Sequence, residues 1–421
     1  MCIFHFTFFL KMVILKTIQK GVIKMGDALN DRKNFFHIAG SGAAIIAVTY
    51  GLCRYSYGLF IPDIQHTFGL SVEWLGIIGS SSYIGYLIAT LITGIFTKKF
   101  GPKIPLFIGG VCAVVGSLLI ACSVNSLILF IGVCIAGMSP GFAFPPMSEY
   151  VVIKLAKDKK DKAISIINSG TSIGIVLAAP FVLFLGVHWR TAWLIFALIS
   201  LLVLIWNFKM SSMKSDSSEN FKIDNEKTTV IKYDQKLIKL IISMLLSGIV
   251  FAAFWTYSVD YIDLSSKISF FTFSLKSTFF SEIFWIVVGG SGLLSVYAYK
   301  IINRYGLRNV FQGALILVAV ATLILAIFPS NGILLLIAGF LFGIGFQLFA
   351  AFSLIWGINI LKEAAAFASG LVLLAMSVGL LLGPIIFAPV IHCYSMCVVF
   401  YIAGIFGIII SFIKPGKNIK A

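Results

Sequence analysis

Two stretches of sequence decide the fold: GIFTKKFGPKIPLFIGG at residues 94–110 and YKIINRYGLRNVFQGA at residues 299–314. Each lies between two long apolar runs, and the two align at a constant offset of 205. The aligned positions are Gly101 with Gly306, Phe100 with Tyr305, Lys99 with Arg304 and Lys103 with Arg308. The same short loop therefore occurs twice, about half a chain apart.

A second pair of stretches supports the same duplication. GTSIGIVLAAP at 170–180 and LLAMSVGLLLGP at 373–384 align through Pro180 and Pro384, at an offset of 204. Two independent anchors that agree to within one residue indicate an internal repeat. Parallel repeats of six membrane spans are one of the known plans of secondary transporters, with the substrate site near the midplane between the halves.

The composition is that of a polytopic membrane protein. The 421 residues are 59% hydrophobic and only 11% charged, with a mean hydropathy of +1.03, whereas soluble domains carry about 25% charged residues. Twelve apolar runs are long enough to span a bilayer, at 35–60, 72–96, 103–123, 126–151, 162–187, 189–208, 237–259, 279–299, 308–328, 331–360, 364–389 and 395–413. We therefore expect an all-α membrane protein with twelve transmembrane helices in two six-helix bundles.

The basic residues predict the orientation of these spans. With the N-terminus inside, 28 of the 32 Lys and Arg residues fall on cytoplasmic segments, as the positive-inside rule requires. Both termini are then cytoplasmic, and the net charge of +16 faces the anionic inner leaflet rather than nucleic acid. The expected organisation is a leader at 1–34, a bundle at 35–208, a cytoplasmic linker at 209–236, a bundle at 237–413 and a tail at 414–421.

The leader is unusual, because its apolar run is interrupted at Lys11 and is too short to span a bilayer. It also lacks the small-residue cleavage site of a signal peptide. Met25 opens a more ordinary polar leader. The sequence is compatible with translation from Met25 or with a basic segment at 1–24 that lies on the membrane surface.

The duplicated loops resemble the signature of the major facilitator superfamily, and the resemblance extends along the chain after about Phe35. The family's loop carries an acidic residue before a basic one, whereas this chain has Lys98 there and Asn303 in the second copy. Lysine cannot accept a hydrogen bond, so the cytoplasmic latch must differ. The positions that match the family's gate loops are Gly94, Lys99, Gly101, Lys103, Arg304, Gly306 and Arg308.

Arg54 is the most informative single residue, since it is the only Lys or Arg between Lys33 and Lys98. An ionisable group inside a membrane is a candidate functional residue by default. On an α-helix Tyr50, Arg54 and Tyr57 share one face, and a guanidinium can hold a carboxylate or phosphate bidentately. Two alternatives stay open: snorkelling of Arg54 to the outer interface, or a structural ion pair with Asp63.

Further candidates follow from polar residues within the apolar runs. Glu149, after the Pro145–Pro146 pair, is a candidate for proton coupling, with Asp63 and Asp260 as the others; an interfacial salt bridge is the alternative for Glu149. Polar residues are also common packing devices between membrane helices. With helix packing as the alternative role, the remaining candidates for substrate binding are Trp255, Tyr257, Asn168 and Gln347.

The function expected from the residues and the resemblance is secondary active transport of a small organic solute by alternating access, in the plasma or bacterial inner membrane. Protons are the expected coupling ion, an anionic metabolite the favoured cargo, and a monomer in the bilayer the expected state. Efflux of amphipathic compounds by proton antiport is the alternative, and a non-transporting sensor a more distant one. An enzyme is not expected, because the histidines lack the spacing of an HExxH metal set, and no cofactor or metal site is expected either. Direct drive by ATP is not expected, because no GxxxxGK[ST] run is present.

Overall fold

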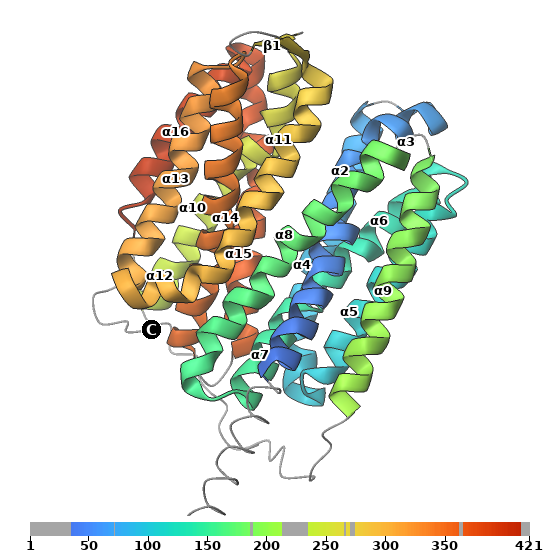
Figure 1. Ribbon diagram of the computed structural model, residues 1–421, viewed down its shortest axis with the longest axis vertical. Coiled ribbons are helices and arrows are strands. Elements are labelled where there is room, and N and C mark those ends of the chain that lie inside the picture. Colours follow the sequence, from blue (N-terminus) through green and yellow to red (C-terminus); the bar gives the residue numbers. More distant parts are fainter. Residues whose placement is uncertain are drawn as a thin grey trace, which may run out of the picture.

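The computed structural model describes residues 35–70, 72–185, 188–212, 235–264, 267–269, 274–361 and 365–413. The predicted leader 1–34, most of the linker 209–236 and the tail 414–421 lie outside the described residues. The rest forms two helical bundles that lie side by side, one from each half of the chain (Figure 1). They are spread at the end that carries α3 and β1 and meet toward the end that carries α7 and α12.

The N-terminal bundle starts with a helix over Phe35–Leu59. Its last part is a π-helix, η1 (Ala47–Tyr55), followed by α2 (Ser56–Leu59). The other elements are α3 (Ile61–Phe68), α4 (Val72–Phe100), α5 (Lys103–Ala121), α6 (Ser126–Gly141), α7 (Phe144–Lys154), α8 (Lys157–Leu185) and α9 (Trp189–Ser212). Prolines occupy both sides of the α6–α7 break, at Pro140, Pro145 and Pro146, where each removes a backbone donor.

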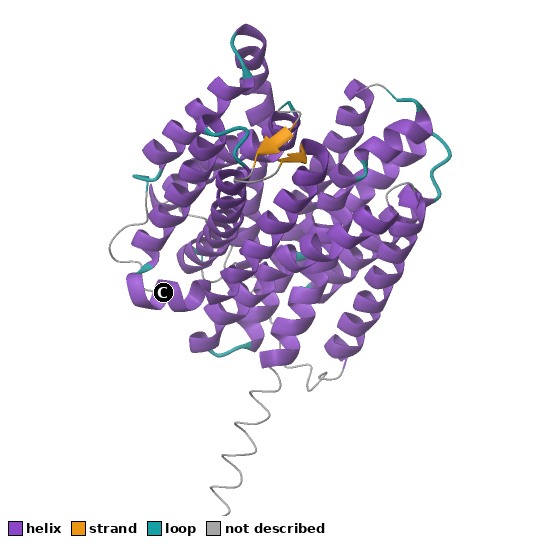
Figure 2. Cartoon of the chain, turned by 45° about the horizontal axis from the view of Figure 1, so that its top comes forward, coloured by secondary structure: helices purple, strands orange, loops and turns teal. Residues whose placement is uncertain are grey.

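The C-terminal bundle repeats this order with one addition. Its helical elements are α10 (Gln235–Asp263), α11 (Ser277–Gly292), η3 (Leu293–Tyr297), α12 (Ala298–Tyr305), α13 (Leu307–Ile327), α14 (Gly332–Ile360), α15 (Ala365–Cys393) and α16 (Met396–Ile410). The addition is an antiparallel pair, β1 (Lys267–Ser269) and β2 (Ser274–Lys276) (Figure 2). The Ser269 amide donates to the Ser330 carbonyl at 2.8 Å. This small sheet was not expected from the sequence.

Helices dominate the described residues, and ten of them are long and apolar enough to cross a membrane. Two helices that the sequence predicts to span the membrane fall outside that group. α8 opens with the charged run KDKKDK, and α16 has only 15 residues. The predicted all-helical membrane architecture is confirmed, while the count of twelve spans and the cytoplasmic position of both termini stay predictions.

The helix pairing is the same in the two bundles. In the first, η1 packs on α8, α4 on α6, and α5 on both α6 and α9. In the second, α10 packs on α15, α11 on α14, and α13 on both α14 and α16. These are equivalent helices in the two halves, so the packing repeats as the duplicated sequence predicts.

The duplicated loop also has one backbone conformation. Gly101 and Gly306 have φ values of 75° and 76°, a region that only glycine enters readily. Each glycine amide donates to a carbonyl four residues earlier, that of Thr97 at 2.9 Å and that of Ile302 at 2.7 Å. The glycine is thus required in both copies because it ends one membrane helix and lets the chain turn into the next.

Candidate functional site

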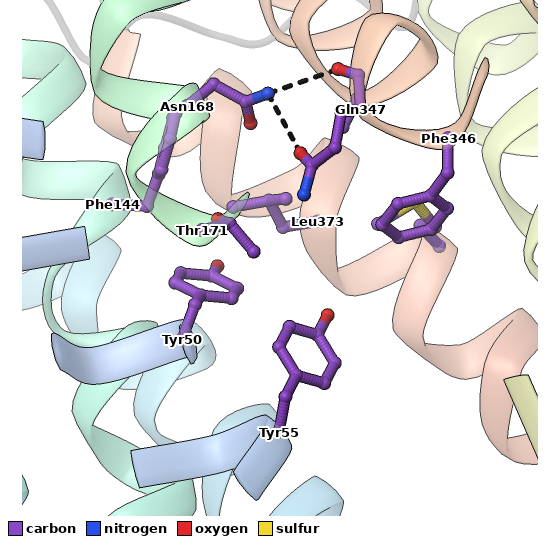
Figure 3. Close-up of a pocket in the computed structure, with 10 residues that line it drawn as sticks. Tyr50, Tyr55, Phe144, Asn168, Thr171, Phe346, Gln347 and Leu373 are labelled. Atoms are coloured by element: carbon purple, nitrogen blue, oxygen red, sulfur yellow. Dashed lines mark hydrogen bonds between the residues drawn. The ribbon is translucent and has the colours of Figure 1, made fainter. Parts of the chain in front are cut away.

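A cavity lies where the two bundles meet (Figure 3). The space between its lining atoms is about 320 Å³ when the volume open to solvent is counted. The N-terminal half contributes Tyr50, Tyr55, Phe144, Asn168 and Thr171, and the C-terminal half Phe346, Gln347, Ala350, Leu373 and Met376. Each half therefore supplies half of the wall, as expected for a site at a repeat interface.

Two buried amides bridge the halves in this wall. The Asn168 Nδ2 atom donates to the Gln347 backbone oxygen at 3.1 Å and to Gln347 Oε1 at 3.2 Å (Figure 3). Asn168 lies on α8 and Gln347 on α14, and each is only 4% exposed. Both were expected to bind substrate, and the structure brings them together. Their remaining polar atoms can bond a ligand without breaking the backbone contact.

Aromatic rings continue the wall beyond the amide pair. Trp255 stacks on Tyr55 across the two halves, with ring centroids 5.4 Å apart and planes at 10°. It also stacks on Trp285 at 4.9 Å and meets the edge of Phe346 at 5.2 Å. Tyr257 lies apart from this stack, with its hydroxyl 3.4 Å from the Pro384 carbonyl. Of the two candidates on α10, Trp255 therefore adjoins the cavity wall and Tyr257 packs against α15.

Arg54 sits beside the cavity inside a cage of four tyrosines. Its Cζ atom lies 4.1 Å from the ring centroid of Tyr86, 4.9 Å from Tyr83, 5.7 Å from Tyr55 and 5.8 Å from Tyr50. The side chain is 7% exposed. Such contacts are attractive because the ring face carries negative charge. The same four tyrosines also act on the guanidinium electrostatically.

The π-helix explains which tyrosines reach Arg54. A π-helix bonds residues five apart rather than four, so Tyr50 and Tyr55 lie one above the other, with ring centroids 6.5 Å apart. The expected α-helical face paired Arg54 with Tyr57 instead. In the structure the Tyr57 hydroxyl lies 3.4 Å from the Leu75 carbonyl, and Tyr57 is not one of the four caging rings.

Three cage residues, Tyr55, Tyr83 and Tyr86, were missed in the sequence. Tyr83 and Tyr86 are three residues apart on α4 and so share one helix face, which was an available signal. That face could be assigned to Arg54 only once the packing of α4 was known. The Tyr50 and Tyr86 hydroxyls lie 3.2 Å apart and share a hydrogen bond.

The three candidate carboxylates lie away from the cavity wall. Asp63 is on the short helix α3, where burial raises the pKa of its carboxyl and nearby His66 opposes that shift. Glu149 is half-buried on α7 and has a neighbour that it interacts with. Asp260 is exposed near the end of α10 and acts electrostatically on Tyr257. No group of three His, Cys, Asp or Glu side chains within the described ranges could hold a metal ion.

The gate loops carry matching cation–ring pairs. Lys99 Nζ lies 5.2 Å from the centroid of the Phe100 ring, and Arg304 Cζ lies 5.3 Å from that of Tyr305. Lys98 is exposed and cannot act as the family's acidic latch. Gly94 faces the other half, since a Cβ built there would lie 3.7 Å from the Phe367 ring. Lys103 and Arg308 lie in the first turns of the helices that follow.

A different contact joins the halves at this end. Lys162 of α8 places its Nζ 5.1 Å from the Phe35 ring of its own half and 5.7 Å from the Tyr299 ring of α12. This cation is thus shared by one aromatic ring from each half. We predict that it holds the halves together here in place of the absent acidic latch.

Lys162→Met should therefore favour opening at this end. Losing a partly buried cation–π contact weakens the closed state by about 1 kcal/mol, a several-fold change in population. The measurement is the labelling rate of a single cysteine placed at Thr171 in the cavity, with an impermeant maleimide added from the linker side. Lys157→Met, which alters an exposed lysine in the first turn of α8, is the control. Equal labelling rates in the two variants would show that Lys162 is no latch.

Comparison with known proteins gives this geometry its context. A family model of the Major Facilitator Superfamily matches residues 43–290. The hexuronate transporter of Bacillus subtilis (strain 168) is 29% identical over 157 residues, covering 37% of this chain and 36% of that protein. Probable anion transporter 3, chloroplastic, of Oryza sativa subsp. japonica is 26% identical over 207 residues, covering 47% and 39%. The chain thus spans under two fifths of the length of these relatives.

A longer match is to multidrug resistance protein 1 of Bacillus subtilis (strain 168), 23% identical over 333 residues and covering 77% of this chain and 82% of that protein. Among solved structures, the transporter FucP in its outward conformation aligns with a TM-score of 0.67 at 14% identity, covering 90% of this chain and 98% of that one. The proton:xylose symporter XylE aligns with a TM-score of 0.68 at 15% identity, covering 91% and 95%. These two likenesses show the fold alone.

The family match spans more than half of the chain and includes most of the first span and the cavity residues of the first half. The duplicated bundles, the apolar helices and the fold of the solved transporters agree with it. The protein is a multi-pass integral membrane protein, and it belongs to the Major Facilitator Superfamily.

Proposed function

We propose that the protein is a secondary active transporter that moves a small organic anion through the cavity between its halves by alternating access. The observation that carries the proposal is the Asn168–Gln347 contact, a buried polar bridge between the halves within the cavity wall. A ligand that engages both amides contacts both halves, so rocking of the halves changes its access from one side of the membrane to the other.

The anionic class rests on Arg54. The guanidinium is buried beside the cavity among four tyrosine rings. Its positive potential therefore acts on the cavity, and a water-poor surrounding strengthens that potential. The names of two relatives, a hexuronate transporter and a probable anion transporter, favour the same class. Carboxylated sugars suit the wall as well, because the amides can bond their hydroxyl groups.

Proton coupling is the second part of the proposal. Among the three candidate carboxylates, Asp63 has its pKa raised by burial, which brings protonation closer to physiological pH. We favour Asp63 as carrier over Glu149 and Asp260 for this reason. The site of action is the plasma or bacterial inner membrane, where a proton gradient is available.

Efflux of amphipathic compounds is the alternative function. Its support is the aromatic wall around Tyr55, Trp255 and Trp285 and the long match to a multidrug resistance protein. Aromatic walls bind lipophilic cations well. The caged arginine opposes this alternative, because like charges repel in a medium of low dielectric constant.

A thermal-shift screen of the purified protein separates the two. A ligand at about 100 times its Kd stabilises the folded state by about 2.7 kcal/mol. We expect D-glucuronate or D-galacturonate to raise the unfolding midpoint by a few degrees, and tetraphenylphosphonium to leave it unchanged. A shift with the lipophilic cation alone would support efflux and refute the anionic class. A non-transporting sensor would bind ligand but show no exchange of it across a liposome membrane.

A further inference from the structure

Arg54 does not itself line the cavity. Of its four caging tyrosines, Tyr50 and Tyr55 belong to the cavity wall, whereas Tyr83 and Tyr86 do not. Two of the four rings therefore belong both to the cage around the guanidinium and to the wall of the cavity. The Arg54 Nε atom is buried and has no hydrogen-bond partner among the described residues.

The hydroxyls of the two wall tyrosines are directed into the cavity. In Figure 3 the phenol oxygens of Tyr50 and Tyr55 point toward Thr171 and the Asn168–Gln347 pair, away from the backbone of their own helix. Tyr50 also shares a hydrogen bond with Tyr86 behind it, at 3.2 Å. The π-helix creates this arrangement, because only a five-residue repeat places both rings on the side of Arg54.

A cation beside a phenol ring makes the phenol hydroxyl a better hydrogen-bond donor. The ring's electrons are drawn toward the guanidinium, which leaves the O–H bond more polar at the opposite end of the ring. Hydrogen bonds to a charged acceptor are roughly twice as strong as neutral ones. The charge of Arg54 can therefore reach the cavity without direct contact.

We propose that the hydroxyls of Tyr50 and Tyr55 bind the carboxylate of the substrate, and that Arg54 selects anions through these two tyrosines rather than by touching them. Arg54 is then a specificity-determining residue whose guanidinium contacts the tyrosine rings and not the substrate. This inference rests on the proposed anionic substrate and names the groups that contact it. The alternative is direct engagement, in which the tyrosines move aside and the guanidinium takes the carboxylate bidentately.

Removal of single hydroxyls separates the two mechanisms, because Phe keeps each ring in the cage. The probes are D-glucuronate and its neutral analogue D-glucuronamide, and the readout is the ratio of their dissociation constants for the purified protein. Tyr55→Phe and Tyr50→Phe should each reduce the preference for the acid about tenfold, the usual worth of a hydrogen bond to a charged group.

The cage itself offers matched controls. Tyr83→Phe removes a caging hydroxyl outside the wall, and Tyr86→Phe removes the same Tyr50–Tyr86 hydrogen bond as Tyr50→Phe does. Both should leave the ratio within about twofold of wild type, since a lone buried hydrogen bond away from the ligand contributes little to discrimination. Arg54→Met should bring the ratio close to one.

The outcomes separate a failure of the tyrosine mechanism from a failure of the proposed anionic substrate. Loss of preference in Arg54→Met, with both wall Phe variants unchanged, would overturn the relay through the tyrosines and leave the anionic substrate standing. Equal losses in all four Phe variants would also overturn it, because the effect would then follow from the cage and not from the wall. A wild-type protein that binds neither glucuronate nor galacturonate would overturn both.

Discussion

Gly51→Ala is expected to destroy the stably folded transporter, while Gly40→Ala on the same helix leaves it intact. A Cβ built at Gly51 would overlap the backbone of Gly174 on α8, whereas none of the atoms considered lies within 4 Å of a Cβ at Gly40. Small residues let membrane helices approach this closely. Overpacking usually costs about 1–3 kcal/mol, and the cost should be higher here because the obstacle is backbone and cannot rotate away.

Gly51→Ala and Gly40→Ala each add one methyl group, so the two variants differ only in the site that is filled. Monodisperse protein on size-exclusion chromatography and the unfolding midpoint in detergent are the two measurements. We expect little or no monodisperse Gly51→Ala protein and a Gly40→Ala midpoint within about two degrees of wild type. A normal midpoint for Gly51→Ala would mean that the first span and α8 do not pack as closely as described.

Asn168→Leu is expected to lower substrate affinity by at least about tenfold while the protein remains folded. The substitution removes both hydrogen bonds to Gln347 and leaves the Gln347 side chain facing an apolar group in a buried wall. An unmet buried amide costs about 1–3 kcal/mol. A ligand that uses both amides should lose a comparable amount of binding free energy.

Asn207→Leu is the control for this loss. Asn207 is half-buried, and its amide donates to the carbonyls of Ser41 and Val203 within one half, at 3.2 and 3.0 Å. It should lower the unfolding midpoint without a selective effect on ligand binding. Equal effects of the two variants on Kd would indicate that Asn168 acts through stability and not through the ligand.

The fold was largely predictable because its signals are periodic or duplicated. Long apolar runs predicted the membrane helices, and the repeated loop at Gly101 and Gly306 predicted two similar bundles, which the shared φ values and helix pairing confirm. The β1–β2 pair was not anticipated, since its three-residue strands are too short to show alternation. It forms in the connection after α10, where backbone groups bond one another and Ser330.

The candidate site was predictable in its residue types but not in its geometry. Arg54, Asn168 and Gln347 stood out because polar groups are rare in apolar spans. The tyrosine cage did not stand out, because Tyr55 faces Arg54 only on a π-helix. A local change from α-helix to π-helix does not alter the spacing of apolar residues in the sequence. The expected partner Tyr57 illustrates the error, since residues three apart are neighbours on an α-helix but not on the five-residue repeat of a π-helix.

The pairing of Lys162 with Tyr299 shows a second limit. Neither residue stands out in the sequence, because each has other basic or aromatic residues beside it. They belong to different halves, and the Lys162 Nζ atom lies 5.7 Å from the centroid of the Tyr299 ring. Contacts between the bundles depend on how two repeats dock, which the sequence of one repeat does not specify. The repeat predicted the bundles, and only the structure brought their facing residues together.

The central claim is that the cavity between the halves carries an organic anion across the membrane. Counterflow tests it most directly, because exchange needs no driving ion: liposomes holding the purified protein are loaded with unlabelled D-glucuronate or D-galacturonate and placed in a trace of the same acid labelled with ¹⁴C. We predict transient accumulation of label with the wild-type protein and at most about a tenth of its rate with Asn168→Leu. Label in wild-type vesicles no higher than in protein-free ones with either acid, or equal rates for the wild type and the variant, would contradict the account.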